Sequence, residues 1–372
     1  MQPPLGQVVL ATTQTAIGWV IFAIFTIGFF TYIFINIRQA RPEIGSEIEL
    51  AANRMPYVAD EELEGRKLDR TLGFGLVLLI VTGITLPLYW LYEPARQSGA
   101  AEGQHETFVS RGQELYEVGA QCVNCHGPEG SGGVASYTIT SSSGEFVKQV
   151  NWQGPALDNV LFRYSREEVL YILEYGRRNT PMPAWGAAGG GPLTEQQLEN
   201  IVDYLESIQL SAGEANAALE VEIERACAPD SEGICTAEEA AAEGWETVGQ
   251  AMFNLGYNSG FSGGSYSCGR CHTAGWSYGE AGPSGGGGSI GFNLRGGLTL
   301  RQFPTPADQV EYISTGSVAG EPYGVRGQSG AGMMPGFGLN PNAEEEDARM
   351  TPDQVMYNQT QIRDIVDYER TL

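Results

Sequence analysis

Histidine is scarce in this chain, with 3 residues among 372, and basic residues are few, with 21 Lys and Arg against 45 Asp and Glu. Three histidines are too few for the haem and copper ligands of an oxygen-reducing centre in a multi-helix bundle. The formal net charge of −24 excludes nucleic acid as a ligand, because phosphate binding depends on Lys and Arg. The glycine-rich stretches at 186–192 and 279–291 lack a phosphate-binding Lys, so we interpret them as loops rather than nucleotide sites.

Two Cys-x-x-Cys-His pentapeptides, at 122–126 and 268–272, carry the strongest functional signal. Thiols at this spacing add across the two vinyl groups of one porphyrin, and the following His becomes the proximal ligand of the iron. Zinc knuckles and a thiol redox motif are the alternatives. Zinc, however, needs four ligands gathered in one place, and no thioredoxin-like pattern is present. The sequence therefore predicts two covalently bound haem c groups, held by Cys122, Cys125, His126, Cys268, Cys271 and His272.

Methionine supplies the expected sixth ligands of both irons. Two of the three histidines are proximal ligands, and we assign the third, His105, to a solvated linker. Met182 and Met334 each precede a proline in a glycine-rich loop, roughly sixty residues after the haem histidine of their own half. Proline stiffens such a loop and removes a backbone donor. Met333 is the alternative ligand for the second haem. Thioether ligation raises the reduction potential, as electron transfer at the oxidising end of a chain requires.

An internal repeat predicts two domains of one kind. In each half a glycine and an aromatic residue four positions later precede the pentapeptide, and a capped amphipathic segment, the Met loop and a closing helix follow it. The glycine–aromatic pairs are Gly112 with Tyr116 and Gly249 with Phe253. The closing helices share the sequence Ile-Val-Asp-Tyr, at 201–204 and 365–368.

The capped segments begin with a capping box at Ser165 and with Pro306 in the first helical position after Thr305. After the N-terminal region, the sequence thus predicts small all-α haem domains. Their expected ranges are 107–210 and 238–372, with an acidic linker at 211–237.

The first 92 residues predict a transmembrane hairpin. Charge-free runs at 17–36 and 72–92 are each about as long as a bilayer-spanning helix. The aromatic residues Tyr89, Trp90 and Tyr92 suit the membrane interface. A cleaved signal peptide is the alternative for the first run, but the run is too long and lacks a basic flank. A buried core helix is the alternative for the second run.

The placement of Lys and Arg predicts the orientation. Residues 1–37 contain none, whereas the loop at 38–71 contains six. The positive-inside rule places this loop in the cytoplasm and both termini outside. Haem attachment to such pentapeptides occurs on the outer side of the bacterial membrane. We therefore expect a multi-pass protein of the bacterial cytoplasmic membrane, with extracytoplasmic haem domains.

Cys227 and Cys235 lie in the acidic segment between the predicted domains. Outside the membrane a local disulfide is expected there, with a contribution of about 2–3 kcal/mol to stability. A copper–thiolate centre is the alternative, but it needs histidines, and both motif histidines are assigned to haem.

Acidic residues dominate the chain from residue 93 onwards, with 37 acidic against 15 basic residues. An acidic face can steer a basic, soluble electron-carrier protein into docking. Solubility or adaptation to salt is an alternative of equal weight.

This order of elements resembles the membrane-anchored di-haem cytochrome c subunit of cbb-type haem–copper oxidases. The resemblance rests on both pentapeptides, on the string Met182-Pro-Ala-Trp-Gly186, and on an anchor followed by two haem domains. The Met-Met-Pro-Gly-Phe string at 333–337, the longer stretch before the second closing helix and the segment at 227–235 depart from that family. The two-helix anchor also resembles that of oxidase subunit II, with haem domains in place of its copper domain.

The resemblance implies an electron-transfer subunit that is not an enzyme by itself. Electrons would enter a terminal oxidase through it, from a soluble electron-carrier protein to polytopic membrane subunits of a respiratory complex. The cytochrome c subunit of a quinol–cytochrome c reductase is an alternative, although the actinobacterial di-haem form has a single, carboxy-terminal anchor. A di-haem peroxidase is a further alternative, but it needs an exchangeable or His-based sixth position. A structural or assembly subunit is the third.

Epitope tags test the predicted orientation. Tags after Gln2 and after Leu372 are expected to be accessible to antibody in intact spheroplasts, whereas a tag near Asp60 is expected to become accessible only after lysis. The reason is that the Lys- and Arg-bearing loop stays in the cytoplasm. Access to the Asp60 tag in intact spheroplasts would contradict the prediction.

Overall fold

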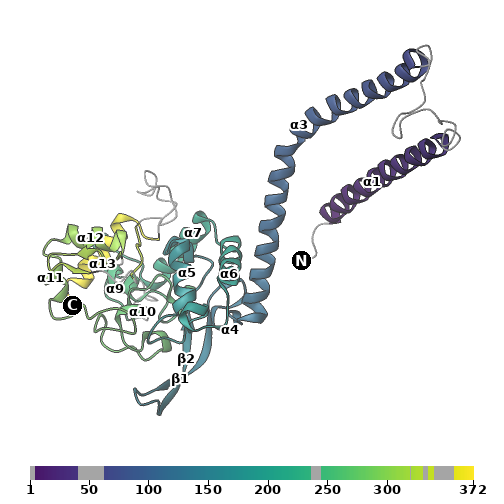
Figure 1. Ribbon diagram of the computed structural model, residues 1–372. Coiled ribbons are helices and arrows are strands. Elements are labelled where there is room, and N and C mark those ends of the chain that lie inside the picture. The colour runs from purple at the N-terminus through teal and green to yellow at the C-terminus, as the bar shows by residue number, and fades with distance from the viewer. Residues whose placement is uncertain (1–4, 41–62, 236–243, 319, 330–333, 339–355) are drawn as a thin grey trace. The chain divides into compact units, whose positions relative to one another are not determined.

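The computed structural model describes residues 5–40, 63–235, 244–318, 320–329, 334–338 and 356–372. These residues are mostly helical (Figure 1). The chain divides into two compact units, Met1–Glu102 and Gly103–Leu372.

The first unit consists of long apolar helices. They are α1 (Leu5–Ala40) and the first part of α3 (Leu68–Glu114), which follows a short π-helical turn, η1 (Leu63–Lys67). One helix, from Glu64 to Gly119, is long and apolar enough to cross a membrane, and none of its apolar window is buried. This helix contains the predicted run at 72–92. The run at 17–36 lies in α1, where the described residues include a shorter apolar stretch, Ala23–Arg38. Most of the predicted cytoplasmic loop at 38–71 lies outside the described residues.

The second unit contains two buried apolar clusters, one in each half. The first half comprises η2 (Leu115–Gly119), α4 (Val123–His126), η3 (Pro128–Gly130), β1 (Gly133–Thr140), β2 (Phe146–Gly154), η4 (Val160–Phe162), α5 (Arg166–Tyr175), η5 (Ala187–Gly189) and α6 (Glu195–Ser207). The second half comprises α7 (Ala212–Ala226), α9 (Val248–Phe253), η6 (Phe261–Gly264), α10 (Gly269–His272), η7 (Trp276–Tyr278), α11 (Leu298–Gln302), α12 (Pro306–Thr315), β3 (Pro322–Tyr323), β4 (Gln328–Ser329) and α13 (Gln359–Glu369).

The predicted helix starts are present in both halves. At α5 the Ser165 hydroxyl accepts a hydrogen bond from the Glu168 backbone N–H at 3.2 Å, and the Glu168 carboxylate accepts one from the Ser165 N–H at 2.8 Å. At α12 the Thr305 hydroxyl caps the Asp308 N–H at 3.2 Å, and Pro306 occupies the first helical position. These caps satisfy backbone donors that the helix itself leaves unpaired.

The closing helix of each half crosses an earlier helix at a glycine. A Cβ atom on Gly112 would lie 1.8 Å from the Asn200 carbonyl oxygen of α6, and one on Gly249 would lie 2.0 Å from the Asp364 carbonyl oxygen of α13. Beside each crossing two aromatic rings pack together. The ring centroids are 5.3 Å apart for Tyr116 and Tyr204, and 5.4 Å apart for Phe253 and Tyr368. The sequence repeat thus corresponds to a repeated helix contact.

The all-α prediction was wrong in one respect, because the first half contains a β-hairpin. Strands β1 and β2 pair antiparallel, with Gly133 opposite Gly154 and Ser136 opposite Asn151. β-Branched and aromatic residues on either side of a Ser/Gly turn favour such a hairpin, although no strand was predicted here. A second pair, β3–β4, has two residues in each strand.

The segment predicted as an acidic linker, 211–237, contains a helix that belongs to the second core. Leu219, Ile223 and Ala226 of α7 are buried in the same cluster as the residues of α9 and α13. Their helical spacing buries one face, while the acidic residues give the segment its charge. Cys227 and Cys235 form a disulfide directly after α7, with 4.9 Å between their Cα atoms.

Alanine substitutions test the helix crossings. Gly112→Ala and Gly249→Ala are each expected to lower the free energy of unfolding by about 1–3 kcal/mol, because the new methyl group meets a backbone oxygen. Gly213→Ala is the control. In α7, a Cβ atom on Gly213 would have none of the described residues within 4 Å beyond its own helix backbone and chain neighbours, so alanine is expected to stabilise the helix by up to about 1 kcal/mol. Urea-induced unfolding of the haem-loaded protein measures all three. Equal effects of the three substitutions would contradict the crossing geometry.

Candidate haem-binding site

Each pentapeptide folds into a single helical turn. In α4 the His126 N–H donates to the Cys122 carbonyl at 2.9 Å, and in α10 the His272 N–H donates to the Cys268 carbonyl at 3.0 Å. Residues three apart on a helical turn share a face. The paired thiols can therefore reach the edge of one planar ring, with the next side chain beneath it. Within the described part of the chain, none of the four motif cysteines forms a disulfide.

Both motif imidazoles are held by one hydrogen bond to the main chain. His126 Nδ1 lies 2.8 Å from the Pro155 carbonyl oxygen, and His272 Nδ1 lies 2.8 Å from the Phe292 carbonyl oxygen. A carbonyl can only accept, so Nδ1 carries the proton and Nε2 keeps its lone pair for a metal. Burial lowers the pKa of His126 to about 4 and also lowers that of His272. Both rings are therefore neutral at pH 7 and able to ligate iron.

The methionine loops of the two halves make the same contacts with the end of the preceding helix. The Met182 carbonyl accepts from the Arg177 N–H at 3.0 Å, and the Met334 carbonyl accepts from the Ser317 N–H at 2.9 Å. Further along the loops, the Trp185 backbone N–H donates to the Leu173 carbonyl at 2.9 Å. The Phe337 backbone N–H likewise donates to the Ile313 carbonyl at 3.0 Å.

A glycine ends the helix in both halves and allows the loop to pass close by. Gly176 and Gly316 have φ angles of 68° and 75°. A Cβ atom on either would lie within 2.7 Å of the main chain of the Met-Pro segment. Only glycine can adopt this positive-φ conformation while the Met-Pro main chain passes so close to its Cα. The two loops are thus held in place in the same way.

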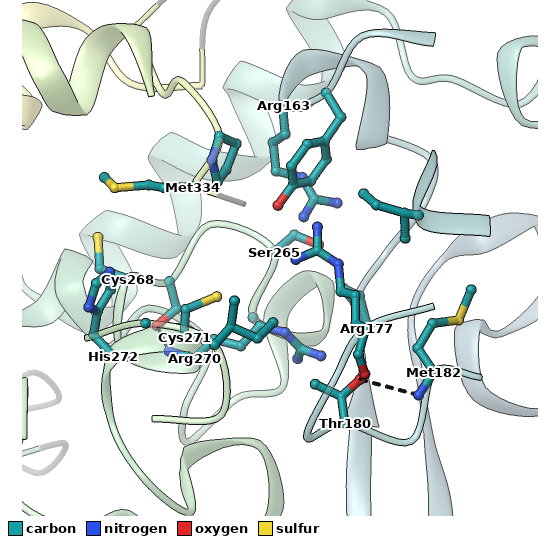
Figure 2. Close-up of a pocket in the computed structure, with 18 of the residues that line it drawn as sticks. Arg163, Arg177, Thr180, Met182, Ser265, Cys268, Arg270, Cys271, His272 and Met334 are labelled. Carbon is teal, nitrogen blue, oxygen red and sulfur yellow. Dashed lines mark hydrogen bonds between the residues drawn. The ribbon is translucent and has the colours of Figure 1, made fainter. Parts of the chain in front are cut away.

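All eight predicted haem residues line one cavity of ≈ 980 Å³. Met182 packs against the first apolar cluster and Met334 against the second. Figure 2 shows Cys268, Cys271, His272 and Met334 on one side of the view and Met182 on the other. The eight residues are Cys122, Cys125, His126, Met182, Cys268, Cys271, His272 and Met334. Met333 lies outside the described residues, and His105 is exposed on α3.

Residues 108–205 match the family model of cytochrome c oxidase, cbb3-type, subunit III. This match indicates a cytochrome c domain in the first half, which implies covalently bound haem c and a role in electron transfer. The match does not extend over the second half. No curated protein and no solved structure matches the chain.

The residues of the cytochrome c domain fit a haem c group. Two thiols, an imidazole with a free Nε2 and a thioether line the same largely apolar cavity. Burial raises the pKa of the Cys122 thiol to about 11, unlike the reactive thiolate of a redox motif. Among the residues that the structure describes, no three His, Cys, Asp or Glu side chains gather as a ligand set for a metal ion such as zinc.

Several charged cavity residues were not predicted from the sequence. Arg163, Arg177 and Arg270 line the cavity, and so does Glu369 of α13. Burial lowers the pKa of Arg163, and it lowers the pKa of Arg270 to about 10. Arg270 lies within the second pentapeptide, so its position in the motif was a usable signal. No sequence pattern marks Arg163 as a cavity residue.

A pH-dependent stability follows from Glu369. This buried carboxyl accepts a hydrogen bond from Gln309 Nε2 at 2.9 Å, and burial raises its pKa from 4.5 to about 7. The folded protein thus binds this proton more tightly than the unfolded chain does. The contribution of protonated Glu369 to the free energy of unfolding is therefore fully present below pH 4.5, and it is lost as the pH rises through 7. Glu369→Gln keeps the hydrogen bond without the charge, so it is expected to reduce the loss of unfolding free energy between pH 5 and pH 8 by roughly 1–3 kcal/mol.

Urea unfolding of the oxidised, haem-loaded protein at the two pH values measures this effect. Glu311→Gln, at an exposed position on α12, is the matched control and is expected to behave as the wild type. An unchanged pH dependence in Glu369→Gln would show that this carboxyl is already ionised in the folded protein.

Proposed function

We propose that the chain is a membrane-anchored di-haem c-type cytochrome that transfers electrons within a respiratory chain. In this proposal Cys122, Cys125, His126 and Met182 hold one haem. Cys268, Cys271, His272 and Met334 hold the other.

The observation that carries the proposal is the repetition of the ligand supports. In the second half, as in the first, a main-chain carbonyl fixes the imidazole at 2.8 Å. A positive-φ glycine at a helix end holds the Met-Pro segment in both halves. The family match covers only the first half, so the equivalent contacts support a second cytochrome c domain at 238–372, with α7 packed against it.

The chain's own residues account for an electron carrier rather than a catalyst. Haem, when bound, supplies reversible one-electron chemistry. In each half the imidazole and the thioether would together hold the iron, which would leave no place for a substrate such as peroxide to bind it. The thioether would favour the ferrous state and raise the potential. The apolar cavity walls, including Val160, Leu173 and Ile313, would exclude water.

The partners follow from the anchor and the family match. We infer that electrons enter a terminal haem–copper oxidase through this subunit, from a soluble electron-carrier protein that docks on an acidic surface. The helix Glu64–Gly119 would anchor the haem domains at the outer face of the bacterial cytoplasmic membrane. The run at 17–36 would complete a hairpin that packs against polytopic subunits.

Purification and haem counting test the proposal. The protein is expected to co-purify with a polytopic haem–copper oxidase core in mild detergent and to carry two haems, measured by mass and by the pyridine haemochrome spectrum. Cys122→Ala/Cys125→Ala is expected to lose one haem, and Cys268→Ala/Cys271→Ala the other, because each domain attaches its own.

Cys227→Ala/Cys235→Ala is the control, since these cysteines form the disulfide, and it is expected to keep both haems. A single haem in the wild type would contradict the second cytochrome c domain. Purification without an oxidase, together with peroxide reduction at a haem that has lost its methionine, would replace the carrier with a di-haem peroxidase.

A further inference from the structure

Three arginines from separate segments project into the cavity that both predicted haem sites share. Arg163 follows η4, Arg177 follows α5, and Arg270 lies in α10. Figure 2 shows Arg163 and Arg177 between Met182 on one side and Cys268, His272 and Met334 on the other. The electrostatic interactions of the three arginines also reach both predicted haem sites. All three arginines interact with Cys271 of the second site, and both Arg163 and Arg270 act on His126 of the first.

Main-chain carbonyls hold two of these arginines in position. Arg163 Nη2 donates to the Ala156 carbonyl at 2.9 Å and to Asn159 Oδ1 at 3.2 Å. Arg270 Nη1 donates to the Gly263 carbonyl at 2.5 Å, and its Nη2 reaches the other half of the unit, donating to the Gln153 carbonyl of β2 at 3.0 Å. These bonds are to neutral groups, so they hold each guanidinium without cancelling its charge.

Arg177 is held by an aromatic ring. Its Cζ lies 5.0 Å from the centroid of the Tyr164 ring, and the Cζ of Arg163 lies 5.6 Å from the same centroid. Cation–π contact orients both guanidinium groups without neutralising their charge. Tyr164 therefore brings the two cations together at the cavity wall.

Within the described part of the chain, no carboxylate is paired directly with this cluster. Among the described residues, no Asp or Glu forms an ion pair with Arg163, Arg177 or Arg270, and the buried Arg163 Nε has no hydrogen-bond partner. Two acidic groups lie near the cluster without forming an ion pair with it, Asp158 near Arg163 and Glu168 near Arg177, and burial raises the pKa of Asp158 to about 6. Glu369 lines the same cavity and accepts its hydrogen bond from Gln309. Arg163 is buried and Arg177 and Arg270 are half-buried, and gathering cations in such a place is costly unless anions accompany them. A further arginine, Arg326, reaches the cavity but is exposed.

We propose that Arg163, Arg177 and Arg270 form one carboxylate-binding site that receives a propionate from each of the two haems. The inference rests on the proposed function, since it requires a haem in both halves. The guanidinium fork matches a planar carboxylate in shape and charge, and it can bind two oxygens at once. A shared site would hold the two haem edges together where the halves of the unit meet. Electrons would then pass between the haems within this cavity.

The cluster should raise the potential of both haems, because a nearby cation favours the less positive ferrous iron. Arg177 is the residue to change. Among the described residues, its side chain makes no hydrogen bond to the main chain of the other half, and its backbone N–H, which supports the Met182 loop, is unaffected by the substitution. Replacing the next residue, the exposed Arg178, by Gln removes the same charge and serves as the control.

Potentiometric titration of the full, haem-loaded protein tests the proposal on Arg177→Gln, Arg177→Lys and the control Arg178→Gln. Arg177→Gln is expected to lower the midpoint potentials of both haems, and Arg177→Lys to restore most of the loss. Redox-induced infrared difference spectra, recorded with ¹³C at the propionate carboxyl groups, are expected to show shifted carboxylate bands for both haems in Arg177→Gln. Arg178→Gln is expected to leave potentials and bands unchanged.

A change confined to one haem would overturn the shared site, and so would equal effects of Arg177→Gln and Arg178→Gln. The haem content separates this inference from the proposed function. Two haems with unmoved potentials would contradict the arginine site alone, whereas a single haem would contradict the di-haem function itself.

Discussion

The hydrogen bond from each motif imidazole to a main-chain carbonyl is the contact on which the remaining geometry depends. It fixes the tautomer and leaves Nε2 free, so this nitrogen would hold the iron of a haem. The chain brings a carbonyl to this position in two different ways. In the first half Pro155 directly follows β2, and a Cβ on Gly154 would lie 2.0 Å from the Cys125 carbonyl oxygen. The hairpin thus serves to deliver one acceptor to His126.

In the second half a glycine-rich loop takes the place of the hairpin. A Cβ on Gly288 would lie 2.2 Å from the Cys271 carbonyl oxygen, and one on Gly291 would lie 2.6 Å from His272 Nδ1. The loop can approach the pentapeptide this closely only because these residues lack side chains. The glycine-rich stretch at 279–291, which composition alone identifies only as a loop, is therefore part of the wall that positions Phe292 and its carbonyl.

The sequence predicted those features that depend on short spacings. The capping box at Ser165 and Pro306 at a helix start are encoded within a few residues. The glycine–aromatic pairs identified the repeat, but not the helix crossings that they form with distant segments. Features that join distant segments could not be predicted in this way. Arg270 binds the Gln153 carbonyl 117 residues away, and α7 packs into a core formed by later helices. Their partners are adjacent only after folding. The shared cavity is of this second kind.

Contacts between the halves explain how the two proposed haem sites can share a cavity. The Ala156 N–H donates to the Ser262 carbonyl at 2.9 Å, and the rings of Trp152 and Tyr278 pack with centroids 5.3 Å apart. Lys148 of the hairpin also pairs with Glu280. These contacts join the first half to the segments on either side of the second pentapeptide. If the proposed function holds, electron transfer between the two haems would need no movement of one half towards the other.

Electron paramagnetic resonance of the fully oxidised protein tests most directly whether two haems occupy one shared cavity. The dipolar interaction between two spins falls with the cube of their separation, so adjacent low-spin ferric haems should broaden each other's signals. We predict that the wild-type spectrum differs from the sum of the spectra of the two single-haem variants, Cys122→Ala/Cys125→Ala and Cys268→Ala/Cys271→Ala. A wild-type spectrum equal to that sum would show that the haems lie too far apart to interact, and would contradict the account.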